Sequence, residues 1–553
     1  MIDVLIIGSG GAGLTAALSA KAAGASVLVV GKAYPTNSQT SMAQGGMNAA
    51  LGNADEDNSK DSIDLHIADT IKSARGLCDD AMVKQMCSDA PNAIAWLESI
   101  GVPFSRLDNV RGLTSDDLLQ SNESSAGLTP NIRTVAQRQM GGASAKRACY
   151  AQDYTGLKIL HTIYDTCLKN NIDFLDEHYL LNLVVREETV RGATFLDIRT
   201  GIVKQINAKS VIIATGGYGG IYHGYTTNAY GSTGDGIAAT IRAGGAVSDM
   251  EFIQFHPTAL KGSSILISES ARGEGGYLVN TAGERFIDEL KPRDVVARAI
   301  FEQFKNGQEV FLDVRHLGEE KLMELLPQEV ALCKLHEHVD PAKELIPIKP
   351  VAHYTMGGID VNNNLEIRGI KGCFAVGECS NAKVHGANRL GGNSLLEITA
   401  FGKRVGENAY KYTQENITLE ADDTQAKYDK EMLDILYNKK PTINFYEKRD
   451  TLGTLFYESV GIIRVNTSLH IALEEILAMQ TDLNQMGIED KSHTNNTNLV
   501  ELLEFSNALL LAPSIISSAI ARDESRGAHF KVGFEAQDDE NFSKNIILQK
   551  KKN

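Results

Sequence analysis

Near the start of the chain stands Val4-Leu5-Ile6-Ile7-Gly8-Ser9-Gly10-Gly11-Ala12-Gly13. Its four apolar residues are typical of a buried parallel strand, and its glycines of a tight turn. Residues 14–23 have the spacing of a helix that Gly24 ends, and residues 27–30 form a second apolar run. We therefore predict a βαβ unit over residues 3–32, at the start of an α/β domain.

The glycine turn fits the pattern GxGxxG. In this pattern Gly8 makes the turn, Gly10 lets a pyrophosphate approach the backbone, and Gly13 allows the helix to pack closely on the strand. The phosphates then lie at the positive end of the helix. A chance glycine turn is the alternative, because the pattern alone is a weak signal. Its position between a strand and a helix favours a dinucleotide site.

The second strand of this unit departs from the usual pattern. Such a strand commonly ends in an acidic residue that binds the ribose hydroxyls of the dinucleotide. Gly31-Lys32 stands at that place here. The ribose contact is therefore expected from another part of the chain.

Further glycine-containing segments are spread along the sequence. They are Ala43-Gln44-Gly45-Gly46, Ala214-Thr215-Gly216-Gly217, Gly234-Asp235-Gly236 and Gly377-Glu378. Each of them alone could be an ordinary turn. Together they favour FAD over NAD as the dinucleotide, because a long cofactor is gripped by loops from many parts of a chain.

The rest of the chain divides by composition. Residues 60–101 and 411–535 show helical spacing, residues 175–211 alternate like strands, and residues 211–214 and 373–376 are further apolar strands. A length of 553 residues exceeds what one hydrophobic core serves. We predict an α/β protein in which a Rossmann-like FAD-binding domain carries an inserted α+β capping domain and a C-terminal helical domain. The predicted boundaries are 1–224 and 351–410 for the FAD-binding domain, 225–350 for the capping domain, 411–535 for the helical domain and 536–553 for a tail.

The charge balance is strongly acidic. The chain has 54 basic and 70 acidic side chains, a net charge of −16. This balance argues against nucleic acid and anionic membranes as partners. It also means that an anionic substrate has to meet a locally basic site.

The cysteine pattern and the apolar segments bear on the compartment. Seven cysteines without a CxxC spacing argue against a disulfide framework and against an iron–sulfur or zinc site, so we expect no metal and a reducing cytoplasm. Met1 leads directly into a strand, so no signal peptide is expected. No segment is expected to span a membrane, because the best stretch, residues 508–521, is short and contains Pro513 and serines.

A set of ordered motifs carries a family resemblance. With them, residues 1–535 resemble the flavoprotein subunits of succinate dehydrogenases and fumarate reductases, and L-aspartate oxidase is a close relative of these. The motifs are Phe255-His256-Pro257-Thr258, Ala271-Arg272-Gly273-Glu274-Gly275-Gly276, Pro292-Arg293-Asp294, His353-Tyr354-Thr355-Met356-Gly357-Gly358, Asn388-Arg389-Leu390-Gly391-Gly392-Asn393-Ser394-Leu395 and Glu524-Ser525-Arg526-Gly527-Ala528-His529.

The resemblance implies a reaction. Reduction of fumarate needs a hydride from reduced flavin, a proton, and cationic groups that hold two carboxylates. In the family, the residues that match His256, Ser268, His353 and Arg389 hold the carboxylates. The residue that matches Arg293 donates the proton, and those that match Glu269 and Arg272 complete a proton relay.

Simpler interpretations of these residues stand beside the functional ones. Arg293 could pair at the surface with Asp294 or Glu289, and His256 and His353 could be satisfied core histidines. Pro292 and Asp294 mark a helix start, however, and a cation in the first helical turn opposes the helix dipole. A functional reason for an arginine at position 293 is therefore favoured.

The resemblance also implies a set of cofactor-binding residues. Their backbone or side chains are expected to line the site of a bound FAD. They are Gly8, Gly10, Gly11, Ala12, Gly13, Lys32, Ser38, Gln39, Thr40, Gly45, Gly46, Ala214, Thr215, Gly216, Asp235, Gly377, Glu378, Arg389, Ser394 and Leu395.

Two departures from the family sharpen this expectation. Most respiratory members tether the flavin covalently through a histidine, and the matching residue here is Gln39. We expect noncovalent FAD, a lower flavin potential and a preference for fumarate reduction. The second departure is Met140, because aspartate oxidases carry an acidic residue there, suited to an ammonium-bearing substrate. L-aspartate oxidase, which would make iminoaspartate, remains the alternative, and a flavin-binding subunit without catalysis is a third possibility.

The expected partners follow from what the sequence lacks. With no recognisable iron–sulfur, haem or nicotinamide motif, the chain would exchange electrons with another polypeptide or a soluble donor. The resemblance implies an iron–sulfur subunit and, through it, a quinone or a thiol. We expect a cytoplasmic protein that binds fumarate or succinate, is held at the inner face of the membrane through partner subunits if at all, and binds no nucleic acid.

Overall fold

A seven-stranded sheet forms the centre of the protein, in a computed structural model that describes residues 1–54, 61–107, 130–416 and 421–549. β1 (Ile2–Ile7) lies between β2 (Val27–Val30) and β9 (Ile202–Ile213), parallel to both. β6 (Asp173–Leu175) and β16 (Cys373–Ala375) extend the parallel part on either side. β7 (His178–Arg186) and β8 (Thr189–Asp197) continue the sheet from β9 in antiparallel order.

The register of the sheet brings the glycine segments together. Ile7 pairs with Val30 and with Ile213, and Ala375 also pairs with Ile213. The carboxyl ends of these strands therefore share one edge, and the turns that follow them lie side by side there. An open parallel sheet binds its ligands at this edge. The register thus explains why turns so far apart in the sequence can serve one site.

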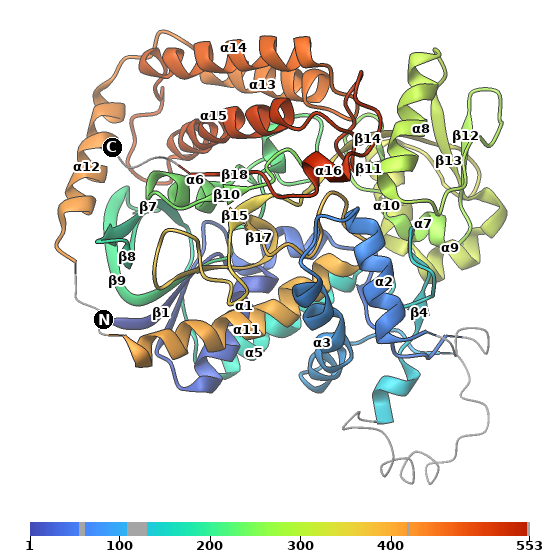
Figure 1. The fold of residues 1–553 in the computed structure, drawn as a ribbon, viewed down its shortest axis with the longest axis horizontal. Coiled ribbons are helices and arrows are strands. Elements are labelled where there is room, and N and C mark those ends of the chain that lie inside the picture. The colour runs from blue at the N-terminus through green and yellow to red at the C-terminus, as the bar shows by residue number, and fades with distance from the viewer. Residues whose placement is uncertain (55–60, 108–129, 417–420, 550–553) are drawn as a thin grey trace.

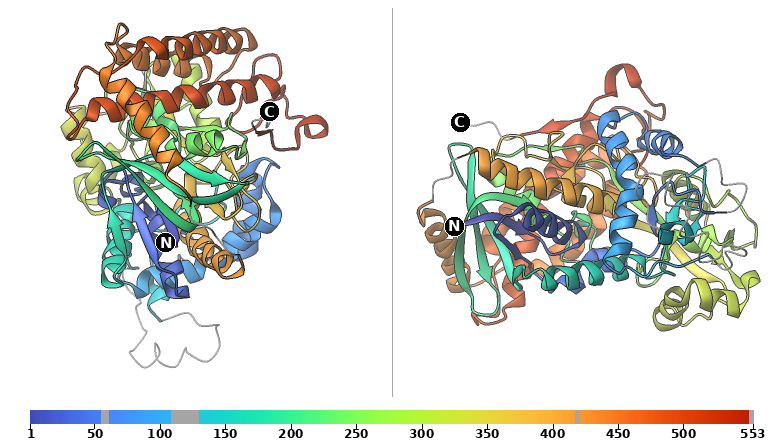
Figure 2. Two further views of the ribbon diagram at one scale, coloured as in Figure 1. Left: turned by 90° about the vertical axis from the view of Figure 1, so that its left-hand side faces the viewer. Right: turned by 90° about the horizontal axis from the view of Figure 1, so that it is seen from below.

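Helices cover the sheet on both sides. α1 (Gly11–Ala23) begins directly after the glycine turn and ends at Gly24, whose φ of 108° favours glycine. It packs on α5 (Thr155–Lys169) and α11 (Asn393–Glu415), and the three run together along one side of the sheet (Figures 1 and 2). α2 (Ile63–Ala74) and α3 (Asp80–Ser99) start at the caps Ser62 and Asp79. β5 (Ala148–Cys149) pairs with both β3 (Met47–Asn48) and β4 (Gln137–Arg138) in a small antiparallel sheet.

A separate unit with its own hydrophobic core stands beside the main sheet, at the right of Figure 1. Its sheet has the order β11 (Ile253–Leu260), β14 (Ile346–Thr355), β13 (Val310–Asp313) and β12 (Tyr277–Asn280). Its helices are α7 (Glu269–Gly273), α8 (Arg293–Lys305), α9 (Glu319–Leu325) and α10 (Pro327–His336). The buried members of this core run from Leu260 to Ile348, within the residues expected to form the capping domain.

The C-terminal region is helical and lies on the side of the sheet opposite α1 and α11 (Figure 2). It contains α12 (Thr424–Asn438), α13 (Phe445–Ser459), α14 (Asn466–Asp482) and α15 (Thr497–Ala521). Between this region and the sheet, α6 (Asp235–Arg242) packs on both β7 and α15.

α15 corrects one expectation from the sequence. Its 25 residues run unbroken through Pro513, so this segment is neither short nor interrupted. Packing against α14, α13 and α6 holds the helix together although proline removes one backbone donor. By length and composition this helix could cross a membrane, and 56% of its most apolar window is buried inside the protein.

The predicted tail is fixed to the fold over the residues that the structure describes. β18 (Ile547–Leu548) pairs with β10 (Val247–Ser248), in a small sheet with β15 (Gly358–Asp360) and β17 (Ser380–Asn381). The carboxylate of Asp249 accepts hydrogen bonds from the backbone of Ile546 at 2.9 Å and from Asn545 at 2.6 Å. α16 (Asp539–Phe542) precedes this strand. The last residues of the predicted tail, 550–553, lie outside the described residues.

Candidate active site

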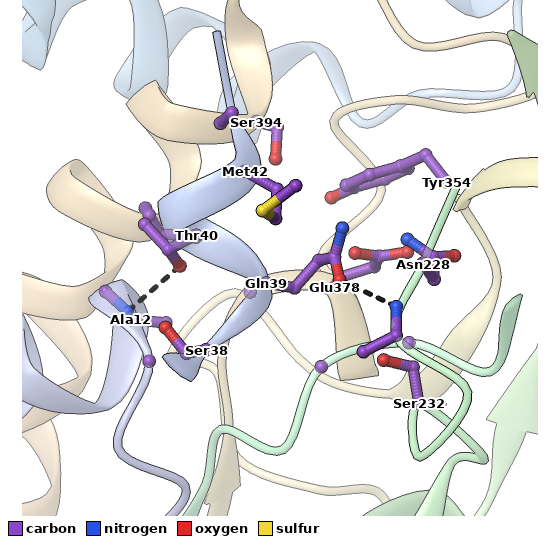
Figure 3. Close-up of a pocket in the computed structure, with 18 of the residues that line it drawn as sticks. Ala12, Ser38, Gln39, Thr40, Met42, Asn228, Ser232, Tyr354, Glu378 and Ser394 are labelled. Atoms are coloured by element: carbon purple, nitrogen blue, oxygen red, sulfur yellow. Dashed lines mark hydrogen bonds between the residues drawn. The ribbon is translucent and has the colours of Figure 1, made fainter. Parts of the chain in front are cut away.

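A cavity of about 380 Å³ runs from the glycine turn at the sheet edge to the capping unit. Its walls come from the turn after β1, the segment that contains Ser38 to Thr40, the turns after β9 and β16, and the start of α11. Figure 3 shows part of this wall, with Gln39, Thr40, Glu378 and Ser394 around the cavity. At the far end the cavity reaches His256, Arg293 and Arg389.

The glycine turn has the conformation that the fingerprint requires. Gly8 has a φ of +112°, and a Cβ there would lie 2.2 Å from the carbonyl oxygen of Ala214. A Cβ on Gly13 would lie 1.9 Å from the carbonyl oxygen of Gly8. A Cβ on Gly10 would meet nothing closer than 3.6 Å, so this position faces open space at the cavity wall. Two glycines are thus needed for packing, and one leaves room for a ligand.

Several buried polar atoms in the wall have no partner within the described residues. They are the hydroxyl oxygens of Ser38 and Thr215 and both amide atoms of Gln44, and all three residues line the cavity. Unpaired buried polar groups are costly, so such atoms point to a polar ligand. The ribityl, pyrophosphate and ring heteroatoms of FAD offer matching partners. The residues present therefore fit this cofactor.

Lys32 closes one end of the cavity. Its ammonium donates to Asp235 at 2.7 Å, to Glu504 at 2.6 Å and to the carbonyl oxygen of Gly231 at 2.6 Å. Burial disfavours its charge, but the two carboxylates outweigh burial and raise the pKa of Lys32. Asp235 also accepts from Tyr179 at 3.1 Å. α6 thus brings an acidic side chain, Asp235, to the end of the cavity where Lys32 follows the second strand, and α15 adds Glu504.

At the other end, Arg293 is held by a carboxylate. Its Nε and Nη2 donate to one oxygen of Glu269 at 2.9 and 2.6 Å. Gly141 donates its backbone N–H to the second oxygen of Glu269 at 2.9 Å. Burial alone would raise the pKa of Glu269, but Arg293 and Arg272 outweigh it and lower the pKa. Glu269 is therefore ionised at neutral pH.

Gln254 joins the two arginines of the site. Its amide oxygen accepts from Arg293 Nη1 at 3.0 Å and from Arg389 Nη2 at 3.2 Å. Its amide nitrogen donates to Asn388 and to the carbonyl oxygen of Arg389. The sequence reasoning missed this residue. A signal was available, because Gln254 directly precedes the Phe255-His256-Pro257-Thr258 motif.

Arg389 lies over an aromatic ring. Its guanidinium carbon is 4.2 Å from the ring centre of Tyr354. The Tyr354 hydroxyl donates to Glu397 at 3.1 Å, and the same carboxylate oxygen is 2.9 Å from His385 Nε2. Burial and the neighbouring Arg293 lower the pKa of Arg389 to about 10, so the side chain remains a cation at neutral pH. Its buried Nε has no partner within the described residues.

Two histidines complete this end of the cavity. The rings of His256 and His353 lie 4.9 Å apart between centres. Burial and the nearby arginines, with Arg293 foremost, hold the pKa of both well below the usual value. Both rings are therefore neutral at physiological pH in the free protein. His353 is partly exposed to the cavity, and its Nδ1 lies 2.7 Å from the hydroxyl of Thr227.

Ser268 lies at the cavity wall, whereas Arg272 lies deeper in the protein. Ser268 lines the cavity as the N-cap of α7, and its hydroxyl accepts from the backbone of Ser270 at 3.1 Å. Arg272 is not part of the cavity wall. It lies behind Glu269, with Nη2 3.7 Å from the nearer carboxylate oxygen, and its side chain is fully buried. Arg272, Glu269 and Arg293 therefore form a row that leads from the interior to the cavity.

The predicted residues converge on this one cavity, with two exceptions. Gly13 packs against Gly8, and Arg272 lies behind the wall. The other predicted residues that line the cavity are Gly8, Gly10, Gly11, Ala12, Lys32, Ser38, Gln39, Thr40, Gly45, Gly46, Ala214, Thr215, Gly216, Asp235, His256, Ser268, Glu269, Arg293, His353, Gly377, Glu378, Arg389, Ser394 and Leu395. Tyr354, Asn228 and Met140 also line it and were not predicted as binding residues.

Two family models match the chain. An "FAD binding domain" matches residues 3–395, and a "Fumarate reductase flavoprotein C-term" domain matches residues 449–553. The first match confirms FAD as the cofactor. The second covers most of the C-terminal helices and the segment that was predicted as a tail.

Curated relatives match the chain along its whole length. The fumarate reductase flavoprotein subunit of Escherichia coli is 37% identical over 99% of this chain and 91% of its own. The 8-methylmenaquinol:fumarate reductase flavoprotein subunit of Wolinella succinogenes is 37% identical over 99% of this chain and 88% of its own. The succinate dehydrogenase flavoprotein subunit of Coxiella burnetii is 37% identical over 99% and 94%.

Solved structures agree with these relatives and confirm the expected α/β fold. An Escherichia coli quinol fumarate reductase chain superposes with a TM-score of 0.90 at 36% identity, over 99% of this chain and 94% of that one. Adenylylsulfate reductase from Archaeoglobus fulgidus shares only the fold, with a TM-score of 0.76 at 16% identity over 99% and 93%. From the site, the fold and the full-length matches together, the chain belongs to the family of fumarate reductase and succinate dehydrogenase flavoprotein subunits.

Proposed function

We propose that this chain interconverts fumarate and succinate by binding the dicarboxylate between its arginines and histidines and by delivering a proton from Arg293. The observation that carries the proposal is the convergence of Arg293, Arg389, His256 and His353 on one end of the FAD cavity. In a chain of net charge −16, this local excess of positive charge suits a dianion.

The dicarboxylate is bound by groups of different kinds. Arg389 offers a guanidinium fork for one carboxylate, and its stacking on Tyr354 fixes the plane of that fork. The neutral rings of His256 and His353 can donate hydrogen bonds without adding charge. The Ser268 hydroxyl lines the same cavity and can donate a hydrogen bond to a carboxylate. These four side chains are the proposed carboxylate ligands.

The proton follows a separate route. Bound FAD supplies the hydride chemistry. Arg293 gives a proton to the carbon that becomes basic when the double bond is reduced, and Gln254 and Glu269 orient its guanidinium. Glu269 restores that proton, and Arg272 lies next along the same row. Positioned proton donors of this kind contribute roughly 10²–10⁴ in rate.

The FAD is proposed to be held noncovalently. Gln39 lines the cavity where most respiratory relatives carry the tethering histidine, and an amide cannot form that bond. Its side chain is engaged by the protein instead, because its Oε1 accepts from the backbone of Ala229 at 3.0 Å (Figure 3). Flavin that leaves the chain in a denaturing gel supports this proposal, and a fluorescent band that stays with the unfolded chain contradicts it.

Electrons are proposed to come from a partner. The full-length match to the flavoprotein subunits of fumarate reductases supports this proposal. An iron–sulfur subunit is the proposed partner, fed by a quinone or a thiol. We place the complex in the cytoplasm, with any membrane attachment at the inner face and through the partner subunits.

Met140 argues against the aspartate oxidase alternative. The side chain lines the cavity, and its methyl group lies 2.7 Å from where a Cβ of Gly45 would be. An apolar thioether at this place offers no countercharge to the ammonium group of aspartate. We therefore favour the dicarboxylate without an amino group.

An anaerobic assay tests the proposed function. Reduced viologen dye supplies electrons, and fumarate is compared with oxaloacetate as the electron acceptor. A separate aerobic assay with L-aspartate tests for the oxidase. The proposal expects dye oxidation that depends on fumarate and no hydrogen peroxide from aspartate. Peroxide formation from aspartate without fumarate reduction would establish the alternative.

A further inference from the structure

The segment Thr226–Ala229, here called the bracket, holds His353 from two sides. The Thr226 hydroxyl and the Thr227 backbone N–H each donate to the carbonyl oxygen of Ala352 at 3.0 Å. Asn228 donates its amide N–H to the carbonyl oxygen of His353 at 3.1 Å. The bracket therefore fixes the backbone of β14 on both sides of the histidine.

The bracket also contacts the ring of His353. The Thr227 hydroxyl lies 2.7 Å from Nδ1, and within the described residues it makes no other hydrogen bond. The other ring nitrogen, Nε2, is then the one left for the cavity, where His256, Arg293 and Arg389 also converge. The hydroxyl can donate to Nδ1 or accept from it, and this choice decides the state of Nε2.

The two choices have opposite consequences for a dianion. If the Thr227 hydroxyl donates to Nδ1, a neutral ring carries its proton on Nε2 and can donate a hydrogen bond to a carboxylate. If Nδ1 carries the proton, Nε2 presents a lone pair, which repels a carboxylate. Burial and Arg293 keep the pKa of His353 well below its usual value, so the ring does not gain a second proton in the free protein.

Gln39 supports the bracket from the cavity side. Its Oε1 accepts from the backbone of Ala229 at 3.0 Å, and its Nε2 lies 3.4 Å from the carbonyl oxygen of Thr227. Figure 3 draws the contact of Gln39 with the backbone of residue 229 as a dashed line. The residue that replaces the family's flavin tether thus contacts two residues of the bracket, Thr227 and Ala229.

We infer that Thr227 is a positioning residue that sets His353 in the tautomer with its proton on Nε2, and that Gln39 anchors the bracket in the place this requires. The inference rests on the proposed function, because it takes His353 as a ligand of the substrate carboxylate. It adds a path by which Gln39, a residue that lines the FAD cavity, acts on dicarboxylate affinity without touching the dicarboxylate.

Substitutions at Thr227 test this path with the FAD-loaded protein and succinate as the ligand. Calorimetry gives the Kd. Thr227→Val keeps the shape and removes the hydroxyl, and it is expected to raise the Kd about tenfold, the loss expected for one hydrogen bond to a charged group. Thr227→Ser keeps the hydroxyl and is expected to restore the affinity. Thr200→Val, at an exposed threonine, serves as the control and leaves the Kd unchanged.

A double-mutant cycle separates positioning from a general structural role. His353→Ala alone weakens succinate binding. Adding Thr227→Val to His353→Ala is expected to change the Kd no further, because the hydroxyl then has no ring to act on. Gln39→Met is expected to raise the Kd in the native background and to leave it unchanged in the His353→Ala background.

A spectroscopic readout reports the tautomer directly. With ¹⁵N-labelled histidine rings, and with the His353 signals assigned by their loss in His353→Gln, the native protein should show Nε2 protonated and Nδ1 bare. Thr227→Val should move the signals toward a mixture of tautomers. A bare Nε2 in the native protein overturns the inference. The inference is also overturned if Thr227→Val keeps the native Kd for succinate while His353→Ala binds succinate weakly. If His353→Ala also keeps the native Kd, the role of His353 in the proposed function fails as well.

Discussion

Arg293 donates two hydrogen bonds to a single carboxylate oxygen of Glu269, from Nε at 2.9 Å and from Nη2 at 2.6 Å. The remaining nitrogen, Nη1, donates to the amide oxygen of Gln254 at 3.0 Å. The pair is buried at the start of α8, where a cation opposes the helix dipole. The carboxylate both offsets that cost and fixes the direction of the guanidinium.

Glu269→Gln is expected to lower the kcat for fumarate reduction by about 10² or more, because the amide can orient Arg293 but cannot return a proton to it. Loss of the carboxylate also leaves the buried Arg293 without its opposite charge, a defect that costs about 3–5 kcal/mol in buried pairs. Viologen-coupled kinetics and thermal unfolding measure the two effects. Glu309→Gln, at an ion pair on the surface of the same unit, is the control. Native kcat in Glu269→Gln would remove the carboxylate from the proton route.

Gln254→Met is expected to raise the KM for fumarate and to lower kcat together. The variant keeps the volume of the side chain but removes the oxygen that stands between the guanidinium groups of Arg293 and Arg389. The two cations then lose their common acceptor and their fixed separation. Steady-state kinetics give both constants, with Gln85→Met on the exposed face of α3 as the control. A variant with native KM and kcat would show that the bridge has no part in catalysis.

Two glycines of the turn should respond differently to alanine. A Cβ at position 13 would lie 1.9 Å from a carbonyl oxygen, so Gly13→Ala is expected to impair folding itself. A Cβ at position 10 would meet nothing closer than 3.6 Å, so Gly10→Ala should fold and lose FAD affinity. Circular dichroism reports the fold, and fluorescence of released flavin reports the affinity. Tight FAD binding by Gly10→Ala contradicts the placement of the pyrophosphate at this turn.

Glu378 should make stability depend on pH. Burial raises the pKa of its carboxyl from the usual 4.5 to about 7. A folded-state pKa above the unfolded one stabilises the protonated form, so this contribution is complete below pH 4.5 and is lost as the pH rises through 7. The thermal midpoint of FAD-free protein should therefore fall between pH 5 and pH 8 by less in Glu378→Gln than in the native chain. An equal fall in both contradicts the assignment.

The sequence predicted those features that local patterns carry. The glycine turn, the apolar strands and the helix start at Pro292 follow from spacing and residue type, and the structure has all three. The site residues could be named because ordered motifs surround them. Lys32 was recognised as a departure, and the structure shows that Asp235 and Glu504 hold it.

The missed features depend on contacts between distant residues. Glu504 reaches the cavity end from a helix 472 positions beyond Lys32, and nothing near it in the sequence marks that role. A proline such as Pro513 normally ends a helix, but tertiary packing keeps α15 continuous at this position. The segment after residue 535 reads as a polar tail, but Asp249 and β10 fix it by hydrogen bonds. Spacing along the chain predicts none of these.

The proton role of Arg293 is tested most directly by a single turnover. The bound FAD is reduced by light without oxygen, fumarate is added, and the return of flavin absorbance is followed for the native chain, Arg293→Ala and the surface control Arg315→Ala. We expect rapid reoxidation in the native chain and the control, and a rate at least about 10³ lower in Arg293→Ala, with FAD and fumarate still bound. Reoxidation of Arg293→Ala by fumarate at the native rate would contradict the account.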